Sequence, residues 1–214
     1  MKIAIIGGTG NMGYGLGLRL ALAGYSVYIG SRDEQKAVAA QQRARERTGS
    51  SEIFGTSNAE AAKAADLVVI AVPSAGHYAT VEALSDIIHT KDVLDITIPL
   101  AFKPLRYAPP QAGSNALETA EILGKDCHVA AGFHTISAVL LEDIGHELTA
   151  DTLIVGNNAE LKALVVKLAE DIGLQAYDAG SLVMSPIVES LTPMLIGMNK
   201  RYGSNHIGIK IEGA

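Results

Sequence analysis

The 214-residue sequence contains one cysteine, Cys127, and no tryptophan. A single cysteine excludes an intrachain disulfide and any metal site built from a cysteine cluster. Aromatic residues make up only 5% of the chain, which argues against a protein that stacks the bases of a single-stranded nucleic acid. The chain has 17 Lys and Arg against 23 Asp and Glu, and this net charge of -6 argues against general nucleic-acid binding.

Long apolar runs are also missing. No stretch approaches the roughly 20 apolar residues that a membrane-spanning helix needs, and the apolar run at the N-terminus is too short for a signal peptide. We therefore expect a cytoplasmic protein that does not bind membranes. Apolar residues make up 48% of the chain and charged residues 19%, which is enough to bury one sizeable core.

Short apolar runs alternate with helix-type segments along the whole chain. Strands are predicted at residues 2–6, 27–30, 53–55, 67–72, 92–98, 128–131, 152–155, 176–178 and 207–211. Helices are predicted at residues 11–23, 33–47, 58–65, 78–89, 116–123, 159–171 and 183–202, with a proline-rich loop at 101–114. This alternation predicts an α/β fold, a doubly wound parallel sheet with helices on both faces and a small C-terminal α/β extension.

A glycine-rich loop follows the first predicted strand. The stretch Gly-Thr-Gly-Asn-Met-Gly that begins at Gly8 fits G-x-G-x-x-G, between a strand and a helix. In such a loop Gly8 permits the tight turn, Gly10 leaves room for a pyrophosphate, and Gly13 lets the helix approach the sheet. Gly13 and Gly17 also make one face of that helix small. The loop predicts a Rossmann-type dinucleotide site, with an ordinary glycine-rich turn as the alternative.

The end of the second predicted strand indicates which dinucleotide is bound. NAD-binding folds place Asp or Glu there, about 20 residues past the glycines, to hold the ribose 2′-hydroxyl. This chain has Ser31 and Arg32 at that point, followed by Lys36. A hydroxyl and cations suit a 2′-phosphate, which a carboxylate would repel. The sequence therefore favours NADP(H), although Ser31 and Glu34 also fit a helix capping box, and the two interpretations can coexist.

Several catalytic motifs are absent. No tyrosine is followed four residues later by lysine, and there is no G-x-S-x-G or H-E-x-x-H. The six histidines have no metal-ligand spacing, so no metal site is expected. Reduction of a carbonyl needs a proton donor. A nicotinamide site without an obvious acid therefore suits a hydride acceptor that delocalises the added charge, such as a flavin-type ring.

Four motifs together carry a more specific resemblance. They are Gly7-Gly8-Thr9-Gly10-Asn11, Gly30-Ser31-Arg32 with Lys36, Phe133-His134-Thr135-Ile136, and Val188-Glu189-Ser190-Leu191-Thr192-Pro193. With them the chain resembles, over almost its full length, the NADPH-dependent coenzyme F420 reductases, also called F420:NADP+ oxidoreductases. The first motif is shared with many Rossmann proteins, whereas the other three are more specific.

The resemblance implies a reaction and an architecture. Members of this family transfer a hydride between C4 of the nicotinamide of NADP(H) and C5 of the 5-deazaflavin of coenzyme F420. A Rossmann domain binds NADP, and a small C-terminal domain closes the deazaflavin cleft. For this chain we place these at residues 1–136 and 137–214, with a weak boundary near 132–137. The resemblance also implies a cytoplasmic homodimer whose partners are small molecules.

The resemblance assigns site residues by position. Contacts to the cofactor phosphates are expected from Thr9, Gly10, Asn11 and Met12. The 2′-phosphate is expected at Ser31, Arg32 and Lys36. Positions along the cofactor and at its nicotinamide end are expected for Val72, Ile98, Ala138 and Ile207. The deazaflavin is expected to meet His134 and Ile136, largely through backbone groups, with catalysis by positioning and no catalytic side chain.

Other polar residues receive structural interpretations. His134 follows a predicted strand, so it is either a deazaflavin contact or a loop histidine that caps the next helix. Glu189 is expected to bond backbone groups, and Asp95 to pair locally. Some relatives have a histidine where this chain has Gly76, so the resemblance does not assign a site role to His77.

Two functional alternatives stay open on the sequence alone. One is another NADPH-dependent reductase, with a ferric or an imine substrate. The other is a regulatory protein that senses NADP without catalysis. A basic docking surface or an added domain would favour regulation, and from this acidic sequence we expect neither.

Overall fold

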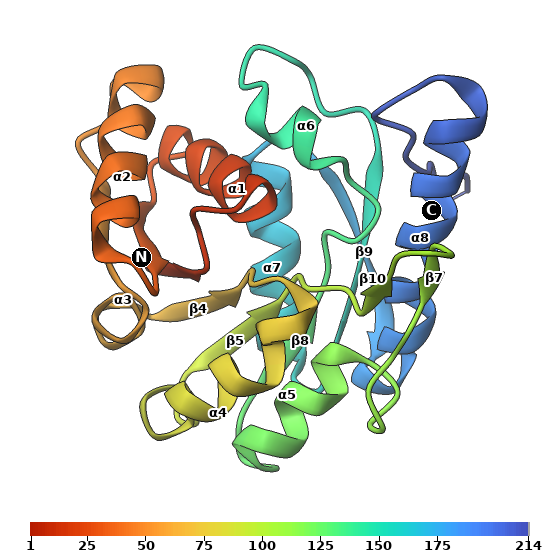
Figure 1. The fold of residues 1–214 in the computed structure, drawn as a ribbon, viewed down its shortest axis with the longest axis horizontal. Helices are drawn as coiled ribbons and strands as arrows, with labels where there is room; N and C mark the ends of the chain where they lie inside the picture. Colours follow the sequence, from red (N-terminus) through yellow and green to blue (C-terminus); the bar gives the residue numbers. More distant parts are fainter. Residues whose placement is uncertain (214) are drawn as a thin grey trace.

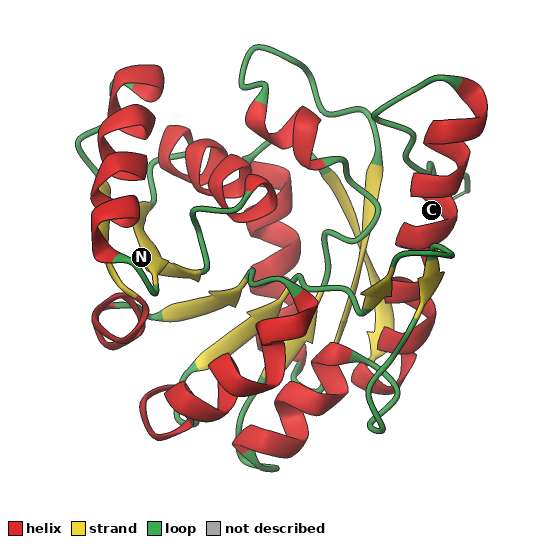
Figure 2. Cartoon of the chain, viewed as in Figure 1, coloured by secondary structure: helices red, strands yellow, loops and turns green. Residues whose placement is uncertain are grey.

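The fold is built on one central sheet, described here for residues 1–213 of a computed structural model (Figures 1 and 2). Its strands are β1 (Lys2–Ile6), β2 (Ser26–Ser31), β3 (Ile53–Ser57), β4 (Leu67–Ile70), β5 (Asp92–Asp95), β8 (Val129–Ala131), β9 (Asp151–Gly156) and β10 (Gln175–Ser181). Their order is β10-β9-β8-β5-β4-β1-β2-β3. Neighbouring strands are parallel except β8 and β9, which are antiparallel.

Helices cover both faces of this sheet. They are α1 (Asn11–Leu22), α2 (Glu34–Thr48), α3 (Asn58–Ala64), α4 (His77–Ile88), α5 (Asn115–Leu123), α6 (Ala138–Glu142), α7 (Ala159–Asp171) and α8 (Ser185–Tyr202). Side chains of α1, α2, α6 and α7 join the apolar core on one face, and those of α3, α4 and α5 join the core on the other. The predicted α/β doubly wound fold is confirmed, and its strand order is of the Rossmann type.

Strand β1 shows why the sequence folds this way. Ile3 and Ile5 are fully buried in one core, and Ala4 and Ile6 in the other. Successive side chains of a strand point to opposite faces. A strand that is apolar at every position is therefore stable only between two layers of helices.

Helix α1 lies close to the sheet, as its small residues predict. A Cβ atom on Gly13 would lie 3.0 Å from Ile5 Cγ2 and from Ala71 Cβ, and one on Gly17 would lie 3.2 Å from Ile5 Cδ1. Larger side chains at these positions would push the helix outward. The distance between the helix and the sheet therefore depends on these glycines.

Two predicted elements differ in the structure. The predicted loop at 101–114 contains the end of a short antiparallel pair, β6 (Leu100–Ala101) with β7 (Arg106–Tyr107). The strand predicted at 207–211 is wrong, since those residues form no strand. Asp151 holds this segment instead, because its N–H donates to the Ile209 carbonyl and its carboxylate accepts from the N–H of Ile211. Bonds from Lys210 Nζ to Asp151 and from the N–H of Ile207 to Asn199 Oδ1 also hold the segment, so it is fixed without a strand partner.

The capping box predicted for Ser31 and Glu34 does not form. The N-cap of α2 is Asp33, whose carboxylate accepts from the N–H groups of Gln35 and Lys36. Ser31 Oγ accepts from the N–H of Asp33 and so precedes the cap. Asp33 is the better cap here because its carboxylate reaches two otherwise unpaired N–H groups.

The sheet continues across the predicted domain boundary. Strands β8 and β9 come from its two sides and are neighbours in the same sheet. The division into residues 1–136 and 137–214 stays a prediction.

Helix α8 confirms the helix predicted at 183–202, with Pro186 in its first turn and Pro193 in its interior. By length and composition alone, the segment Leu182–Tyr202 could cross a membrane. In the protein, however, its inner face buries Val188 and Leu195, and it carries the buried carboxylate of Glu189. We therefore assign the helix to the globular fold.

Candidate functional site

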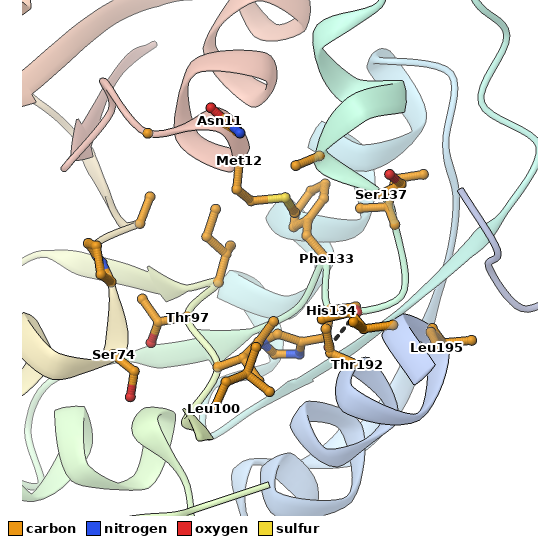
Figure 3. Close-up of a pocket in the computed structure, with 18 of the residues that line it drawn as sticks. Asn11, Met12, Ser74, Thr97, Leu100, Phe133, His134, Ser137, Thr192 and Leu195 are labelled. Atoms are coloured by element: carbon orange, nitrogen blue, oxygen red, sulfur yellow. Dashed lines mark hydrogen bonds between the residues drawn. The ribbon is translucent and has the colours of Figure 1, made fainter. Parts of the chain in front are cut away.

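The main cavity lies at the carboxyl ends of the central parallel strands and has a volume of about 690 Å³ (Figure 3). Its walls come from the loops after β1, β4, β5 and β8, from α6 and α8, and from the C-terminal segment. The lining includes Gly10, Asn11, Met12, Val72, Ile98, His134, Ile136, Ala138, Thr192 and Ile207. Among residues 1–213, no Asp, Glu, Lys or Arg lines this cavity. We call it the large cavity.

A second, polar cavity of about 450 Å³ adjoins the first. Both are lined by Gly10 and Val72, so they meet at the end of the glycine loop. The other predicted residues that line the second cavity are Thr9, Ser31, Arg32 and Lys36. We call it the small cavity. All thirteen residues predicted from the sequence therefore line one cavity or both.

The N-terminus of α1 opens between the two cavities. No side chain caps this helix, and its first turn carries no acidic residue. Unpaired N–H groups and the helix dipole at such an end favour an anion. A Cβ atom on Gly10 would have only one neighbour within 4 Å, the Gly7 carbonyl oxygen at 3.5 Å. The space at Gly10 therefore remains open for a ligand.

The small cavity combines cations with one carboxylate. Arg32 and Lys36 are exposed, and Lys36 Nζ lies 3.7 Å from Asp33 Oδ2. The other Asp33 oxygen is used as the N-cap of α2. Within the described chain, Arg32 has no hydrogen bond or ion pair. Its guanidinium is available to an anion that enters this cavity.

His134 is the most unusual polar side chain of the large cavity. Its residue is only 2% exposed, and neither ring nitrogen has a hydrogen-bond partner among the described residues. Burial lowers the pKa of His134 to about 4, although the Asp95 charge opposes this, so the ring is neutral at pH 7. The carbonyl of His134 accepts from Thr192 Oγ1 at 2.6 Å, the bond drawn as a dashed line in Figure 3. Buried polar groups without partners are uncommon, and ligands often complete them.

The backbone turns sharply just before His134. Phe133 is buried and has a φ of 64°, a left-handed conformation that a bulky residue rarely adopts. Its N–H donates to Thr152 Oγ1 at 2.9 Å, which holds the turn. The turn directs the chain from β8 into the wall of the large cavity. Backbone strain of this kind is common at functional sites.

A buried ionic cluster lies behind the large cavity. His77 Nε2 is 2.8 Å from Asp95 Oδ2, and His77 Nδ1 is 2.8 Å from Glu118 Oε2. Burial alone would lower the pKa of His77, but these two carboxylates outweigh it and raise the pKa to about 9. Asp95 also accepts from the N–H and hydroxyl of Thr97, which lines the cavity. We expected Asp95 to pair with residues close in sequence. This is correct for Thr97, but Asp95 also pairs with His77 of α4.

Glu189 has the structural role predicted for it, which is to bond backbone groups. Its carboxylate is fully buried on α8 and accepts from the N–H groups of Asn115 and Ala116 and from the Tyr107 hydroxyl. Burial and the Asp95 charge raise the pKa of Glu189 to about 8. The carboxylate thereby ties α8, a wall of the large cavity, to the first turn of α5.

Sequence reasoning missed part of the large cavity. Its further residues come from the β6–β7 hairpin and the inner face of α8, and they include Leu100, Phe102, Leu195, Ile196 and Asn199. Of these segments, only the motif on α8 that runs from Val188 to Pro193 indicated a role in the site. The others are ordinary apolar and amide residues, and no spacing pattern marks them.

Comparison with known proteins identifies the family. Residues 2–99 match the family model described as NADP oxidoreductase coenzyme F420-dependent. The chain is 39% identical to the F420-dependent NADP reductase of Methanocaldococcus jannaschii, over 99% of this chain and 98% of that protein. It is also 39% identical to the F420-dependent NADP reductase of Methanothermobacter marburgensis, with the same coverage of both.

A solved structure agrees with these sequence matches. The crystal structure of a protein from Arthrobacter sp. FB24, assigned to the F420-dependent NADP reductases, has a TM-score of 0.86 to this chain. The two are 27% identical, and each is covered completely. With full-length identity of 39% to curated relatives, and with the motif residues gathered around two joined cavities, this chain belongs to the F420-dependent NADP reductase family.

Proposed function

We propose that the two cavities together bind NADP(H) and coenzyme F420, and that the reaction of the family, hydride transfer between the two, takes place in the large cavity. One observation carries this proposal. A large cavity without Asp, Glu, Lys or Arg adjoins a small one with two exposed cations, and the N-terminus of a helix opens between them. This arrangement suits a ligand with uncharged rings at one end, a pyrophosphate in the middle and a further phosphate at the other end.

The phosphate groups are assigned to the glycine loop and the small cavity. Thr9, Gly10, Asn11 and Met12 surround the start of α1, where N–H groups suit the pyrophosphate. The hydroxyl of Ser31 and the cations of Arg32 and Lys36 would hold the 2′-phosphate. The open space at Gly10 and the unpaired Arg32 fit such a ligand.

The ring systems are assigned to the large cavity. Val72 and Ile98 follow β4 and β5 and would lie along the cofactor, with Ala138 and Ile207 closing its nicotinamide end. The neighbouring residues His134 and Ile136 would contact the deazaflavin. The unpaired ring nitrogens of His134 fit a partner that brings its own hydrogen-bonding groups.

The chemistry belongs to the ligands, and the protein contributes position and exclusion of water. When bound, NADPH supplies a hydride at C4 of the nicotinamide, and the deazaflavin accepts it at C5. His134 stays neutral at pH 7 and so holds no proton ready for donation. The apolar walls keep water from the rings. Orientation of two reactants can by itself account for about 7–11 kcal/mol of a barrier.

The direct test mixes the protein with NADPH and oxidised F420 and follows the loss of deazaflavin absorbance. We expect rapid reduction with NADPH and much slower reduction with NADH at the same concentration. A boiled sample and a sample without protein are the controls. Reduction that is equally fast with NADH would contradict the assignment of Ser31, Arg32 and Lys36. No reduction with either nucleotide would contradict the assignment of the large cavity.

We also propose that two copies pair through the outer face of α8. Val183, Ile187 and Met194 share one side of this segment, and each is more than half exposed. The only charged residue among 182–199 is Glu189, which is buried, so a two-fold contact between identical helices brings no like charges together. Light scattering should give the mass of a dimer for the wild-type protein and of a monomer for Ile187→Glu. A wild-type monomer at micromolar concentration would contradict the pairing.

The cytoplasmic location also remains a proposal. Cys127 is a buried, free thiol, and burial raises its pKa to about 11. A chain without disulfides is typical of a reducing compartment. Cell fractionation with an antibody against the protein would test it.

A further inference from the structure

One buried cation, Arg19, lines neither cavity. Arg19 lies on α1 and is only 8% exposed. Its guanidinium donates to four backbone carbonyl groups, all within residues 138–146. Nε donates to Leu141 O at 3.0 Å, and Nη2 lies 2.7, 2.7 and 2.9 Å from the carbonyl oxygens of Leu140, Asp143 and His146. We call residues 138–146 the α6 segment.

The α6 segment cannot hold its conformation alone. Helix α6 has five residues, and so short a helix is unstable without tertiary contacts. The last carbonyl groups of a helix also lack partners within the helix. Arg19 supplies donors to these carbonyl groups and places a positive charge at the negative end of the helix dipole. A single side chain therefore supplies the donors for the Leu140, Leu141 and His146 carbonyl groups, while other carbonyl groups of the segment accept from backbone N–H groups.

A second contact brings the two helices together without any side chain between them. A Cβ atom on Gly15 would lie 2.7 Å from the backbone N of Glu142 and 2.9 Å from the carbonyl carbon of Leu141. Helices α1 and α6 thus touch backbone to backbone at Gly15. Figure 1 shows α6 lying next to α1. Arg19 lies one turn further along α1 and clamps the same segment.

Both helices reach the large cavity with their other ends. Asn11 and Met12 of α1 line it, and so do Ala138 and Val139 of α6 with Ser137 before them. The guanidinium of Arg19 is therefore the link that sets one wall of the cavity relative to the helix that follows the glycine loop. On its exposed side the α6 segment has one further arginine contact, from Arg47 of α2, which donates to one backbone carbonyl and to the carboxylate of Glu142.

We propose that Arg19 is a positioning residue for hydride transfer, because it fixes the α6 wall of the large cavity against α1. The proposal rests on the proposed function, since it assumes that the nicotinamide and the deazaflavin meet in this cavity. Loss of the clamp leaves NADP(H) its phosphate contacts on the glycine loop and in the small cavity. It relaxes only the wall at the rings, so it should lower the rate of transfer more than the affinity for the cofactor.

The test compares Arg19→Met with Arg19→Lys and with the matched control Arg47→Met. Arg19→Met keeps a long side chain but removes every donor, and Arg19→Lys keeps the charge and one donor group. In single-turnover reactions with saturating F420 we expect hydride transfer to slow by about 10- to 100-fold in Arg19→Met, the scale of a misplacement near 1 Å. The rate of hydride transfer in Arg19→Lys should lie between the rates of Arg19→Met and the wild type. The dissociation constant of NADPH should change by less than about threefold, and Arg47→Met should be within about twofold of the wild type throughout.

Hydrogen exchange provides a readout that does not depend on F420. Backbone amides of residues 138–146 should exchange faster in Arg19→Met than in Arg47→Met. The exchange rates of amides in β1 and β4 should be the same in both variants. Faster exchange there with a wild-type transfer rate would overturn the proposal, as would equal losses of rate and of NADPH affinity. If Arg19→Met does not fold, a wild-type rate in Arg19→Lys would overturn it. A wild-type protein that does not reduce F420 would count against the proposed function instead, and exchange would still test the clamp.

Discussion

The large and small cavities share a border at Gly10 and Val72 but are built on different principles. The small cavity presents exposed cations, which can select a phosphate by charge. The large cavity presents mostly apolar side chains and no acidic or basic one other than His134. Asp95 is buried behind its wall, where it accepts hydrogen bonds from Thr97 of the lining. The difference is the basis of the proposed division, in which charge in the small cavity selects the nucleotide and shape in the large cavity promotes the reaction. The following experiments test whether the two regions divide the work in this way.

The largest effect is expected at the border itself. In Gly10→Val the new side chain meets no close neighbour in the protein, so the fold should be retained and the variant should melt near the wild-type temperature. The side chain would occupy the approach to the pyrophosphate, and NADPH binding should fall by more than about 100-fold. Fluorescence titration with NADPH measures this loss.

Gly13→Val is the matched contrast to that change. Its Cβ would lie 3.0 Å from Ile5 Cγ2 and Ala71 Cβ, so Gly13→Val should melt at a lower temperature than Gly10→Val. If Gly10→Val bound NADPH normally, the loop would be only a turn, and the border would have no function.

A smaller effect is expected within the small cavity. A hydrogen bond to a charged group is worth about 1.5–3 kcal/mol, and each 1.4 kcal/mol is about tenfold in affinity. Arg32→Ala should therefore weaken NADPH by roughly 10- to 100-fold. NADH lacks the 2′-phosphate, so its affinity should hardly change. Equal losses for the two nucleotides would show that Arg32 does not recognise the phosphate.

A still smaller effect is expected at His134 in the large cavity. A neutral hydrogen bond contributes about 0.5–1.5 kcal/mol, which is roughly threefold to tenfold. His134→Ala should therefore slow single-turnover hydride transfer by no more than about tenfold, mainly through weaker F420 binding. General acid catalysis would be worth about 10²- to 10⁴-fold. A loss of three orders of magnitude at saturating F420 would show that His134 donates a proton and that shape alone does not explain the reaction.

The smallest effect concerns stability rather than activity. The folded pKa of His77 is raised from 6.5 to about 9, so its stabilising contribution is complete below pH 6.5 and is lost as the pH rises through 9. The folded pKa of Glu189 is raised from 4.5 to about 8, which gives the same sign. The melting temperature should therefore fall between pH 6.5 and pH 9, by about 2–4 °C for each 1 kcal/mol lost. His77→Gln should flatten this dependence, and a flat wild-type profile would mean that the cluster does not titrate in this range.

Local patterns in the sequence predicted much of the fold. Apolar runs bounded by glycine and proline predicted the strands, because a strand buried on both faces must be apolar at every position. The pattern failed at 207–211, where an apolar stretch is held by Asp151 without a partner strand. Apolar composition indicates burial, but the partner in a ladder depends on which segments the topology brings near.

The candidate site shows the same limit. The glycine loop and the residues at the end of β2 could be predicted, since each depends on neighbours within a few positions. The inner face of α8 and the hairpin residue Phe102 could not, because nothing in their own spacing marks a cavity wall. Likewise, His77 has neither of its ionic partners close by in the sequence, so the sequence does not indicate them. Only folding brings it between Asp95 and Glu118, which are 18 and 41 residues away.

The sequence by itself determined the Rossmann-type sheet, and it predicted a dinucleotide loop and a site for a 2′-phosphate, because all three follow from short-range spacing and side-chain chemistry. The tertiary structure alone decided how the large cavity is enclosed. Arg19 meets the Leu141 carbonyl across 122 residues, and Glu189 meets the N–H of Asn115 across 74. Such contacts exist only after the chain has packed, since the backbone groups that they pair carry no mark in the sequence.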